Sequence, residues 1–191
     1  MDLKLCVRNF NADLGFAFDG DGDRLGVVVP SGEIIWPDQL MVMFARDVLK
    51  RNPGSSIIYD VKCSNRLATA IDEAGGKPVM WRTGHSLIKR KMQELSAPLA
   101  GEMSGHFFFK ERWLGFDDGI YAACRLLEIL ALDDRRPSEV LLELTGSAST
   151  PEIKVPMKEG RGQQFIDEFR RRAEFEGANI STIDGLRADY P

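Results

Sequence analysis

Three aspartates at alternate positions, Asp19, Asp21 and Asp23, form the segment of the chain best suited to chemistry. Their carboxylates repel one another, and gathering them in one place is costly unless a cation neutralises them. Hard divalent ions such as Mg²⁺ take oxygen ligands of this kind and keep positions open for water or a phosphate. The intervening glycines permit the tight curve that would bring the carboxylates together. The spacing therefore predicts a Mg²⁺ site, with Arg24 beside it as a phosphate-binding cation.

Two other interpretations of the acidic segment compete with metal binding. The segment lies between the apolar runs 14–18 and 25–29, and an Asp-Gly pair between such runs is a strong signal for a β-hairpin. A hairpin needs one such pair, however, and not three carboxylates. An EF-hand calcium loop requires Gly at its sixth position and Glu at its twelfth, where this chain has Arg24 and Pro30. We therefore favour metal binding over a plain turn and do not expect a calcium sensor.

From Pro37 onward, the pattern of apolar residues predicts alternating strands and helices. Asp38 is an expected helix N-cap, because Met41, Phe44 and Val48 follow it at helical spacing. This order predicts an α/β fold with a mixed, mostly parallel sheet, flanking helices and partial flanking domains. The further elements expected are strands at 56–59, 78–81, 99–103 and 106–109, a helix capped at 64 or 65, a helix at 86–95, and a helix starting at 117 or 118.

Ligands of such sheets bind at the carboxyl ends of the strands, and three loops fall there. The first places Lys62 after a strand, where it could meet a phosphate or a sugar oxygen, although a solvated surface lysine explains it equally well. The second has Gly84 and His85 at the start of a helix, which is a favourable position for an anion. For the basic triplet 89–91 on that helix, we favour an exposed helix face.

The third loop contains Glu102, Ser104 and His106. Glu102 and Ser104 alternate along a segment expected to be extended, so both can point to one side. A carboxylate acceptor beside a hydroxyl donor suits vicinal sugar hydroxyls, and His106 has the pKa range for general acid–base catalysis. Composition alone would favour a polar turn between two strands. Asp117 and Asp118 are interpreted as helix-capping residues with a structural role.

The bulk composition argues against several classes of function. The 191 residues are 43% hydrophobic and 28% charged, as in ordinary globular proteins, and the net charge of −4 argues against nucleic acid as a partner. No apolar stretch is long enough to span a bilayer, and the residues after Met1 lack the apolar core of a signal peptide. Three isolated cysteines, Cys6, Cys63 and Cys124, suggest a reducing compartment, so we expect a cytoplasmic protein with no membrane partner.

The pattern changes beyond Leu144. Residues 145–151 are mostly small and are typical of a linker between domains. One helix and two or three strands would form only a thin core after this linker, so we expect 151–191 to be the start of a domain. At the other end of the chain, we expect residues 2–10 to be the last helix of an earlier domain. The elements expected after the linker are a strand at 153–157, a helix carrying Phe165, Phe169 and Ala173, and a strand near 180–183.

Taken together, these motifs resemble the α-D-phosphohexomutases, and most closely their bacterial phosphomannomutase/phosphoglucomutase branch. They occur in the family's order and spacing and cover nearly the whole chain. The segments that carry the resemblance are Ala17–Arg24, Asp60–Cys63, Arg82–Ser86, Gly101–His106, Phe109–Trp113 and Gly115–Gly119.

The resemblance implies an isomerase that interconverts the 6-phosphates and 1-phosphates of mannose and glucose. The reaction would pass through a bisphosphate intermediate, with an active-site phosphoserine as donor, Mg²⁺ as cofactor and glucose 1,6-bisphosphate as activator. The longer parent protein is expected to be a monomer. The residues that the resemblance implies are Asp19, Asp21 and Asp23 for the metal, His106, Lys62 and Arg24 for catalysis, and Glu102, Ser104, His85, Gly84 and Lys62 for the substrate.

Family members have four domains, and the chain resembles only some of them. Residues 1–36 correspond to the end of domain 2 with the metal loop, 37–146 to a complete domain 3 with the sugar loop, and 151–191 to the start of domain 4. The family's nucleophilic serine lies in a Thr-x-Ser-His-x-Pro-type loop of domain 1, and this chain contains no Ser-His pair. The phosphate-clamping loop of domain 4 would follow Pro191. We therefore assign the activity to the parent protein and expect no turnover from these residues alone.

Two main hypotheses follow, and a third has less support. The chain could be a piece of a mutase, which an upstream coding sequence with the serine loop would favour. It could instead be a standalone module that binds sugar phosphate and Mg²⁺ without catalysis, which an intact start signal at Met1 would favour. A phosphatase with Asp19 as nucleophile is disfavoured, because that class has Thr or Val where this chain has Asp23.

Overall fold

The computed structural model describes residues 2–146, 150 and 153–190 of the chain. The chain divides into two compact units, Met1–Gly146 and Ser147–Pro191. The expected boundary between residues 36 and 37 falls inside the first unit, and the three-part division of the chain stays a prediction. None of the helices in the described ranges is long and apolar enough to cross a bilayer.

The N-terminal part of the first unit contains a three-stranded antiparallel sheet in the order β1-β2-β3. Phe18 at the end of β1 lies opposite Leu25 at the start of β2, so residues 19–24 form the connecting loop of a hairpin. The hairpin interpretation is therefore confirmed, and the loop of the hairpin carries all three carboxylates. The elements here are α1 (Leu3–Asn9), β1 (Gly15–Phe18), β2 (Leu25–Val28) and β3 (Ile34–Ile35), of which the sequence pattern does not predict β3.

The second sheet of this unit has four strands in the order β5-β4-β6-β7. Strand β4 runs parallel to both β5 and β6, whereas β7 returns antiparallel to β6. The mixed, mostly parallel α/β sheet is thus confirmed, and the carboxyl ends of three strands meet at one edge. The strands are β4 (Ser56–Asp60), β5 (Lys77–Trp81), β6 (Leu99–Gly101) and β7 (Phe107–Phe109).

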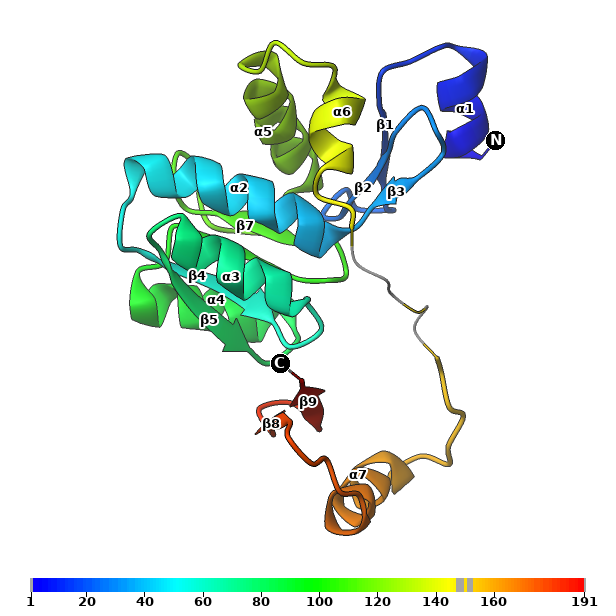
Figure 1. Cartoon of the computed structure of the whole chain (residues 1–191), viewed down its shortest axis with the longest axis vertical. Helices are drawn as coiled ribbons and strands as arrows, with labels where there is room; N and C mark the ends of the chain where they lie inside the picture. The colour runs from blue at the N-terminus through cyan, green and yellow to red at the C-terminus, as the bar shows by residue number, and fades with distance from the viewer. Residues whose placement is uncertain (1, 147–149, 151–152, 191) are drawn as a thin grey trace. The chain divides into compact units, whose positions relative to one another are not determined.

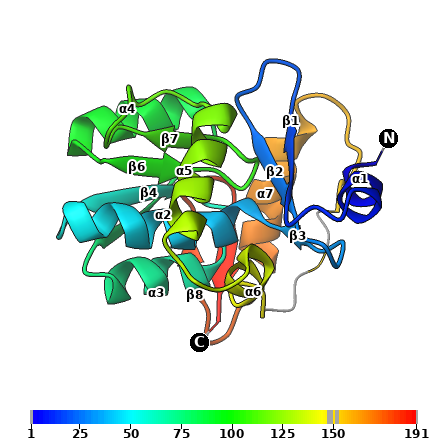
Figure 2. The ribbon, with the colours of Figure 1, turned by 90° about the horizontal axis from the view of Figure 1, so that it is seen from above.

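Helices cover both faces of this sheet (Figures 1 and 2). Alternate residues of a strand point to opposite faces, so Ile57 and Tyr59 pack with α2 and α3 in the main core, while Ile58 packs with Ile88 and Met92 of α4. Gly101 at the end of β6 lets that strand approach α2 closely, since a Cβ there would lie 2.4 Å from Met41 Sδ. The helices are α2 (Pro37–Arg51), α3 (Asn65–Glu73), α4 (His85–Leu95), α5 (Gly119–Ala131) and α6 (Pro137–Leu142), of which α6 is not predicted.

The expected N-cap at Asp38 is wrong, because α2 already begins at Pro37 and Trp36 holds the cap position. Proline is well suited to the first helical residue, where its missing N–H is not needed. The Trp36 N–H is instead satisfied by Gln39 Oε1 at 2.8 Å. The carboxylate of Asp38 accepts from Ser64 N at 3.1 Å and so ties the start of α2 to the start of α3.

The second unit confirms the expected helix and the strand near residue 180. The expected strand at 153–157 is wrong: the segment has no ladder partner among the described residues, and Ile153 and Val155 are exposed. A strand requires a neighbour for its hydrogen bonds. The expected linker lies partly outside the described residues, at 147–149 and 151. The elements of this unit are α7 (Arg161–Arg172), β8 (Asn179–Ser181) and β9 (Arg187–Asp189), with β8 and β9 antiparallel.

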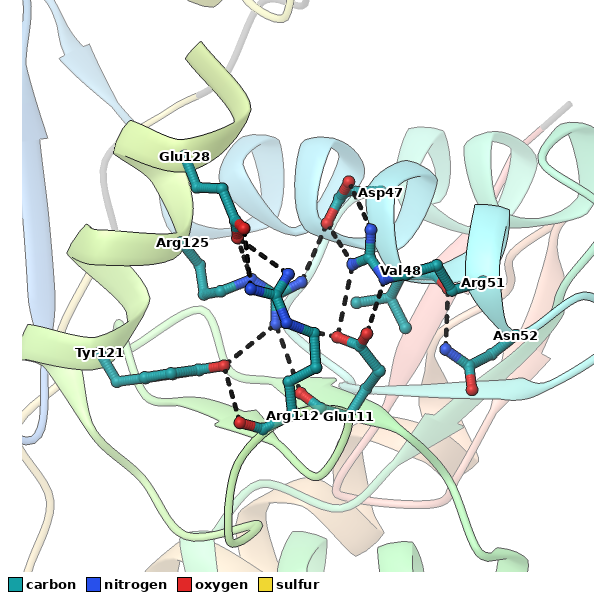
Figure 3. Close-up of polar contacts among 9 residues, drawn as sticks. All are labelled: Asp47, Val48, Arg51, Asn52, Glu111, Arg112, Tyr121, Arg125 and Glu128. Carbon is teal, nitrogen blue, oxygen red and sulfur yellow. Dashed lines mark hydrogen bonds and ion pairs between the residues drawn. The ribbon is translucent and has the colours of Figure 1, made fainter. Parts of the chain in front are cut away.

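A buried ionic network joins α2, α5 and the loop after β7 (Figure 3). The guanidinium of Arg125, whose side chain is 3% exposed, contacts Asp47 Oδ2 and Glu111 Oε2, both at 2.9 Å. Arg51 contacts the same two carboxylates at 2.6 Å each, and Tyr121 Oη lies 3.2 Å from Arg125. Burial acts to raise the pKa of both carboxyl groups, but the hydrogen bonds from the two arginines outweigh it and lower the pKa. The network fixes the loop after β7 against two helices.

Candidate functional site

The hairpin loop gathers the three predicted metal ligands. One oxygen from each of Asp19, Asp21 and Asp23 lies within 4.8 Å of the others. Gly22 adopts a φ of 77°, a conformation that glycine favours, and its N–H closes the turn onto Asp19 O at 3.3 Å. Arg24 Nε lies 3.2 Å from Asp19 Oδ2 and so offsets part of the negative charge. The structure therefore brings these four predicted residues together.

The donor set of this loop fits a hard divalent cation. Asp23 Oδ1 is covered from solvent and accepts no hydrogen bond from the described part of the chain. The nearest cationic groups are His106 Nε2 at 3.3 Å and Arg24 Nε at 3.8 Å. Burial, together with the neighbouring carboxylates, raises the pKa of Asp23 despite the opposing effect of His106. A covered carboxylate oxygen with free lone pairs is suited to a metal ligand.

A second group, Asp23, His106 and Asp117, also has ligand atoms within 4.8 Å of one another. Asp117, however, already pairs with Lys89 Nζ at 2.9 Å and with His85 Nδ1 at 3.3 Å. Both of its oxygens are therefore engaged. The aspartates of the hairpin loop remain the better ligand set for an ion.

Residues 102–106 join β6 to β7, and we call them the sugar loop after their predicted ligand. They form a tight turn, so the extended segment expected here is wrong. Glu102 N donates to His106 O at 2.9 Å, and Gly105 N donates to Glu102 O at 3.0 Å. Glu102 and Ser104 nevertheless meet, with 3.4 Å between Ser104 Oγ and Glu102 Oε2, because the turn folds back on itself. The polar turn that composition alone favours is thus the observed structure, and it still groups the predicted polar side chains.

Glu102 is the acceptor at the centre of this turn. Its side chain is 2% exposed, and it accepts from Gly84 N at 2.6 Å and contacts His106 Nδ1 at 2.9 Å. Burial acts to raise the pKa of Glu102, but the hydrogen bonds from His106 and Gly84 outweigh it and lower the pKa. The same Glu102 contact raises the pKa of His106 against the effect of burial. The start of α4 thus already donates to an internal carboxylate through Gly84 N, and a ligand anion at Gly84 and His85 stays a prediction.

The hairpin loop and the sugar loop meet at His106. Arg24 and His106 form an isolated antiparallel bridge, and Leu25 N donates to Gly105 O at 3.1 Å. Arg24 Nε lies 3.2 Å from His106 Nε2, close to the 3.3 Å that separates the same nitrogen from Asp23 Oδ1. Neutral Nε2 can accept from Arg24, and protonated Nε2 can donate to Asp23, but it cannot do both. His106 thus connects the two predicted parts of the site.

Asp117 and Lys89 are site residues that sequence reasoning missed. The sequence pattern assigns Asp117 to helix capping and Lys89 to an exposed face. Their side chains nevertheless form an ion pair, and Asp117 also contacts His85, which the sequence did predict as a site residue. The cap of α5 is Asp118, which accepts from Tyr121 N at 2.8 Å. Lys89 lies one helical turn after His85 on the same face of α4, and this spacing is the signal that could have found it.

Asp60 is a further residue that sequence reasoning missed. Its fully buried carboxylate accepts from Met103 N at 3.1 Å, Cys63 Sγ at 3.1 Å and Thr83 Oγ1 at 3.3 Å. It thereby joins the three loops at the carboxyl ends of β4, β5 and β6. The signal that could have identified Asp60 is its position, since it is a charged residue at the very end of an apolar strand.

Lys62 is exposed in the turn after β4, and its catalytic role stays a prediction.

Gly119 allows the start of α5 to approach the hairpin loop closely, because it has no Cβ. Its N–H donates to Gly22 O at 3.0 Å, and a Cβ at this position would lie 2.5 Å from the backbone oxygen of Arg24. We expect Gly119→Ala to destabilise the first unit by about 1–3 kcal/mol and to weaken Mg²⁺ binding, because backbone cannot yield as a side chain can. Urea unfolding and Mg²⁺ titration would measure both effects. Gly20→Ala is the matched control, since a Cβ there meets nothing within 4 Å; equal behaviour of the two variants would contradict the prediction.

Comparison with known proteins agrees with this architecture. Residues 36–147 match the family model for α/β/α domain III of phosphoglucomutase/phosphomannomutase. The chain therefore belongs to the phosphoglucomutase/phosphomannomutase family, as the motifs indicated. Among its relatives is the phosphomannomutase/phosphoglucomutase of Pseudomonas aeruginosa, which is 57% identical over 190 residues, covering 100% of this chain and 41% of that protein. The chain thus spans about two fifths of the length of this relative.

Two solved structures illustrate the likeness. A phosphoglucomutase/phosphomannomutase family protein from Burkholderia thailandensis aligns with a TM-score of 0.92 at 54% identity, covering 100% of this chain and 40% of that one. The N-acetylphosphoglucosamine mutase of Aspergillus fumigatus, solved with GlcNAc-6P and magnesium, aligns with a TM-score of 0.63 at 14% identity, covering 92% of this chain and 48% of that one. The second likeness is one of fold alone.

Proposed function

We propose that this chain carries the metal loop and the sugar loop of a Mg²⁺-dependent phosphomannomutase/phosphoglucomutase. Such an enzyme interconverts hexose 6-phosphate and hexose 1-phosphate through a bisphosphate intermediate and a phosphoserine. The observation that carries the proposal is the meeting of the two loops at His106, which lies 2.9 Å from Glu102 and 3.3 Å from Asp23. A sugar held by one loop would present its phosphate to the other.

The substrate would be held by the polar turn. Glu102 and Ser104 would bind sugar hydroxyls, since a carboxylate has about four lone-pair sites and can accept further bonds beside those it makes within the protein. His106 and Lys62 would assist proton transfer, and His85 would lie against the ligand beside Gly84. Because these groups recognise hydroxyls common to mannose and glucose, the phosphates of both sugars are proposed substrates.

The proposed metal ligands are Asp19, Asp21 and Asp23, whose oxygens lie within 4.8 Å of one another. A bound Mg²⁺ would stabilise negative charge on the transferring phosphoryl group. Arg24 supplies a fixed positive charge in the same loop and could contact a phosphate in bidentate fashion. The magnesium in the Aspergillus fumigatus neighbour is in keeping with this cofactor.

The organisation of the longer protein is part of the proposal. Residues 1–36 would complete domain 2, residues 37–146 would form domain 3, and residues 151–191 would begin domain 4. The division of the chain after Gly146 and the family match to 36–147 support the second boundary. The parent protein would be a monomer with glucose 1,6-bisphosphate as activator. In the described part of this chain, Cys6, Cys63 and Cys124 form no disulfide, which supports a cytoplasmic location.

Calorimetric titration and a coupled mutase assay on the 191-residue chain test the proposal. We expect saturable binding of Mg²⁺ and of glucose 1-phosphate. Asp23→Asn should weaken Mg²⁺ binding by at least the roughly 10–100-fold that outer-shell substitutions cause, and Glu102→Gln should weaken sugar-phosphate binding by about tenfold. Asp72→Asn, an exposed carboxylate on α3, is the matched control.

The mutase assay would contain glucose 1-phosphate, Mg²⁺ and a trace of glucose 1,6-bisphosphate. We expect no turnover, because the chain has no Ser-His pair to supply the family's phosphoserine. Turnover would contradict the requirement for that serine, and the phosphorylated residue would then be mapped within this chain. If the wild-type chain bound neither ligand, the proposed site would be wrong.

A further inference from the structure

A cavity of about 340 Å³ lies between α2, the C-terminal part of α5 and α6 (Figure 1). Its volume falls within the range of roughly 300–1,000 Å³ that is typical of small-molecule sites. The described residues that line it include none of those proposed for the metal or the sugar. The cavity is therefore distinct from the candidate site. The apolar side chains that line it are Met43 of α2, Ile129 of α5, Val140 of α6 and Leu144 after α6.

Two cations of α2, Arg46 and Lys50, also line this cavity. They lie one helical turn apart on the same face of α2, and both are exposed. In the described part of the chain, neither side chain forms an ion pair or a hydrogen bond. The helix dipole favours a cation in the last turn, which accounts for Lys50 but not for Arg46. Both positive charges are therefore available to a bound anion.

The acidic side chains that line the cavity are already matched by arginines. Asp47 Oδ2 lies 2.6 Å from Arg51 Nη2 and 2.9 Å from Arg125 Nη2. Glu143 Oε1 lies 2.6 Å from Arg135 Nη1. Among the described lining residues, the charge that is left without a partner is thus positive. A ligand that enters the cavity meets this charge on one side and the apolar side chains on the other.

We propose that the cavity binds a small organic carboxylate with an apolar body. Arg46 can hold both carboxylate oxygens at once, because its guanidinium matches their planar geometry, and Lys50 adds a second positive charge. The apolar body then covers Met43 and its apolar neighbours and removes their surface from water. A metal cation would be repelled by the two free cations, and a free sugar would gain little from the apolar lining. The site is independent of the proposed mutase chemistry.

Calorimetric titration of the 191-residue chain with 2-naphthoate tests this site. We expect saturable binding of one molecule per chain. Methyl 2-naphthoate lacks the charge and acetate lacks the apolar body, so each should bind at least about tenfold more weakly. Arg46→Gln should weaken 2-naphthoate binding by about tenfold, because glutamine keeps the helix propensity but not the charge. Arg90→Gln is the matched control, since Arg90 is an exposed arginine of α4 that does not line the cavity.

Methyl spectra of the methionines would locate the bound probe. The signal of Met43 should shift when 2-naphthoate is added, whereas that of Met92, which packs in the core under α4, should not. Excess glucose 1-phosphate should leave the probe bound; displacement would place 2-naphthoate in the candidate site and overturn the inference. Absence of saturable binding, equal affinity for the neutral ester, or an unchanged affinity in Arg46→Gln would also overturn it.

Discussion

Replacement of Arg125 by alanine is expected to lower the free energy of unfolding of the first unit by about 3–5 kcal/mol. The guanidinium lies between Asp47 and Glu111, and its loss leaves these two buried carboxylates to share Arg51 alone. It would also remove the packing of the guanidinium over the ring of Phe109, which lies 4.8 Å away. The effect is large because an uncompensated buried charge cannot regain the water it lost on folding.

Urea unfolding followed by tryptophan fluorescence would measure this loss, because Trp36, Trp81 and Trp113 all lie in the first unit. Arg112→Ala is the matched control. Arg112 also pairs with an acidic residue, but its side chain is 48% exposed, so its removal should cost no more than about 1 kcal/mol. If Arg125→Ala and Arg112→Ala shifted the unfolding midpoint equally, the network would not have the stabilising role that its burial indicates.

Replacement of Asp60 by leucine is expected to destabilise the first unit by about 3 kcal/mol and to abolish sugar-phosphate binding. Leucine is branched like aspartate but larger, and it leaves the N–H of Met103 and the donors of Cys63 and Thr83 without their acceptor. Burial raises the pKa of Asp60 despite these hydrogen bonds, so its charge is itself unfavourable. The acceptor oxygens, and not the charge, are the stabilising part of the side chain.

Asp60→Asn separates these two contributions. Its amide oxygen can accept from Met103 N, while its NH₂ group can donate to the Thr83 hydroxyl, which accepts as well as donates. We expect the asparagine variant to unfold within about 1 kcal/mol of the wild type and to retain glucose 6-phosphate binding. Unfolding curves and calorimetric titrations on both variants would separate the contribution of the acceptor oxygens from that of the negative charge. A loss in Asp60→Asn as large as that in Asp60→Leu would show that the negative charge is required.

The parts of the site that the sequence predicted are those whose partners are close in the chain. Asp19, Asp21 and Asp23 lie within five residues, so repulsion and spacing were enough to indicate a shared centre. The pairing of Lys89 with Asp117 joins positions 28 residues apart, and only the packing of the loop before α5 against α4 creates it. No local pattern in a single sequence contains that information.

The fold was predictable where apolar periodicity or breakers marked an element. The strands and helices of the four-stranded sheet follow the expected order, because Pro and Gly separate clear apolar runs. The capping of α2 was not predictable from residue type, since Trp36 has no capping side chain and Gln39 supplies the acceptor instead. The strand expected at 153–157 had the right alternation, but alternation does not provide a hydrogen-bonding neighbour.

Because β7 runs antiparallel to β6, its two ends lie at opposite edges of the sheet, and substitutions near each end should impair a different property of the protein. The strand starts at the sugar loop and ends near Glu111, whose N–H bonds back to Pro98 at the far edge, where the ionic network lies. Inherited or engineered changes at the far edge would reduce how much folded protein a cell contains, while each surviving molecule would bind its ligand normally. A change to an exposed side chain at the loop edge, such as His85, would do the reverse and leave protein levels intact and binding poor, whereas loss of the buried Asp60 would impair both. Separate measurements of abundance and affinity would therefore indicate at which edge of the sheet a damaging substitution lies.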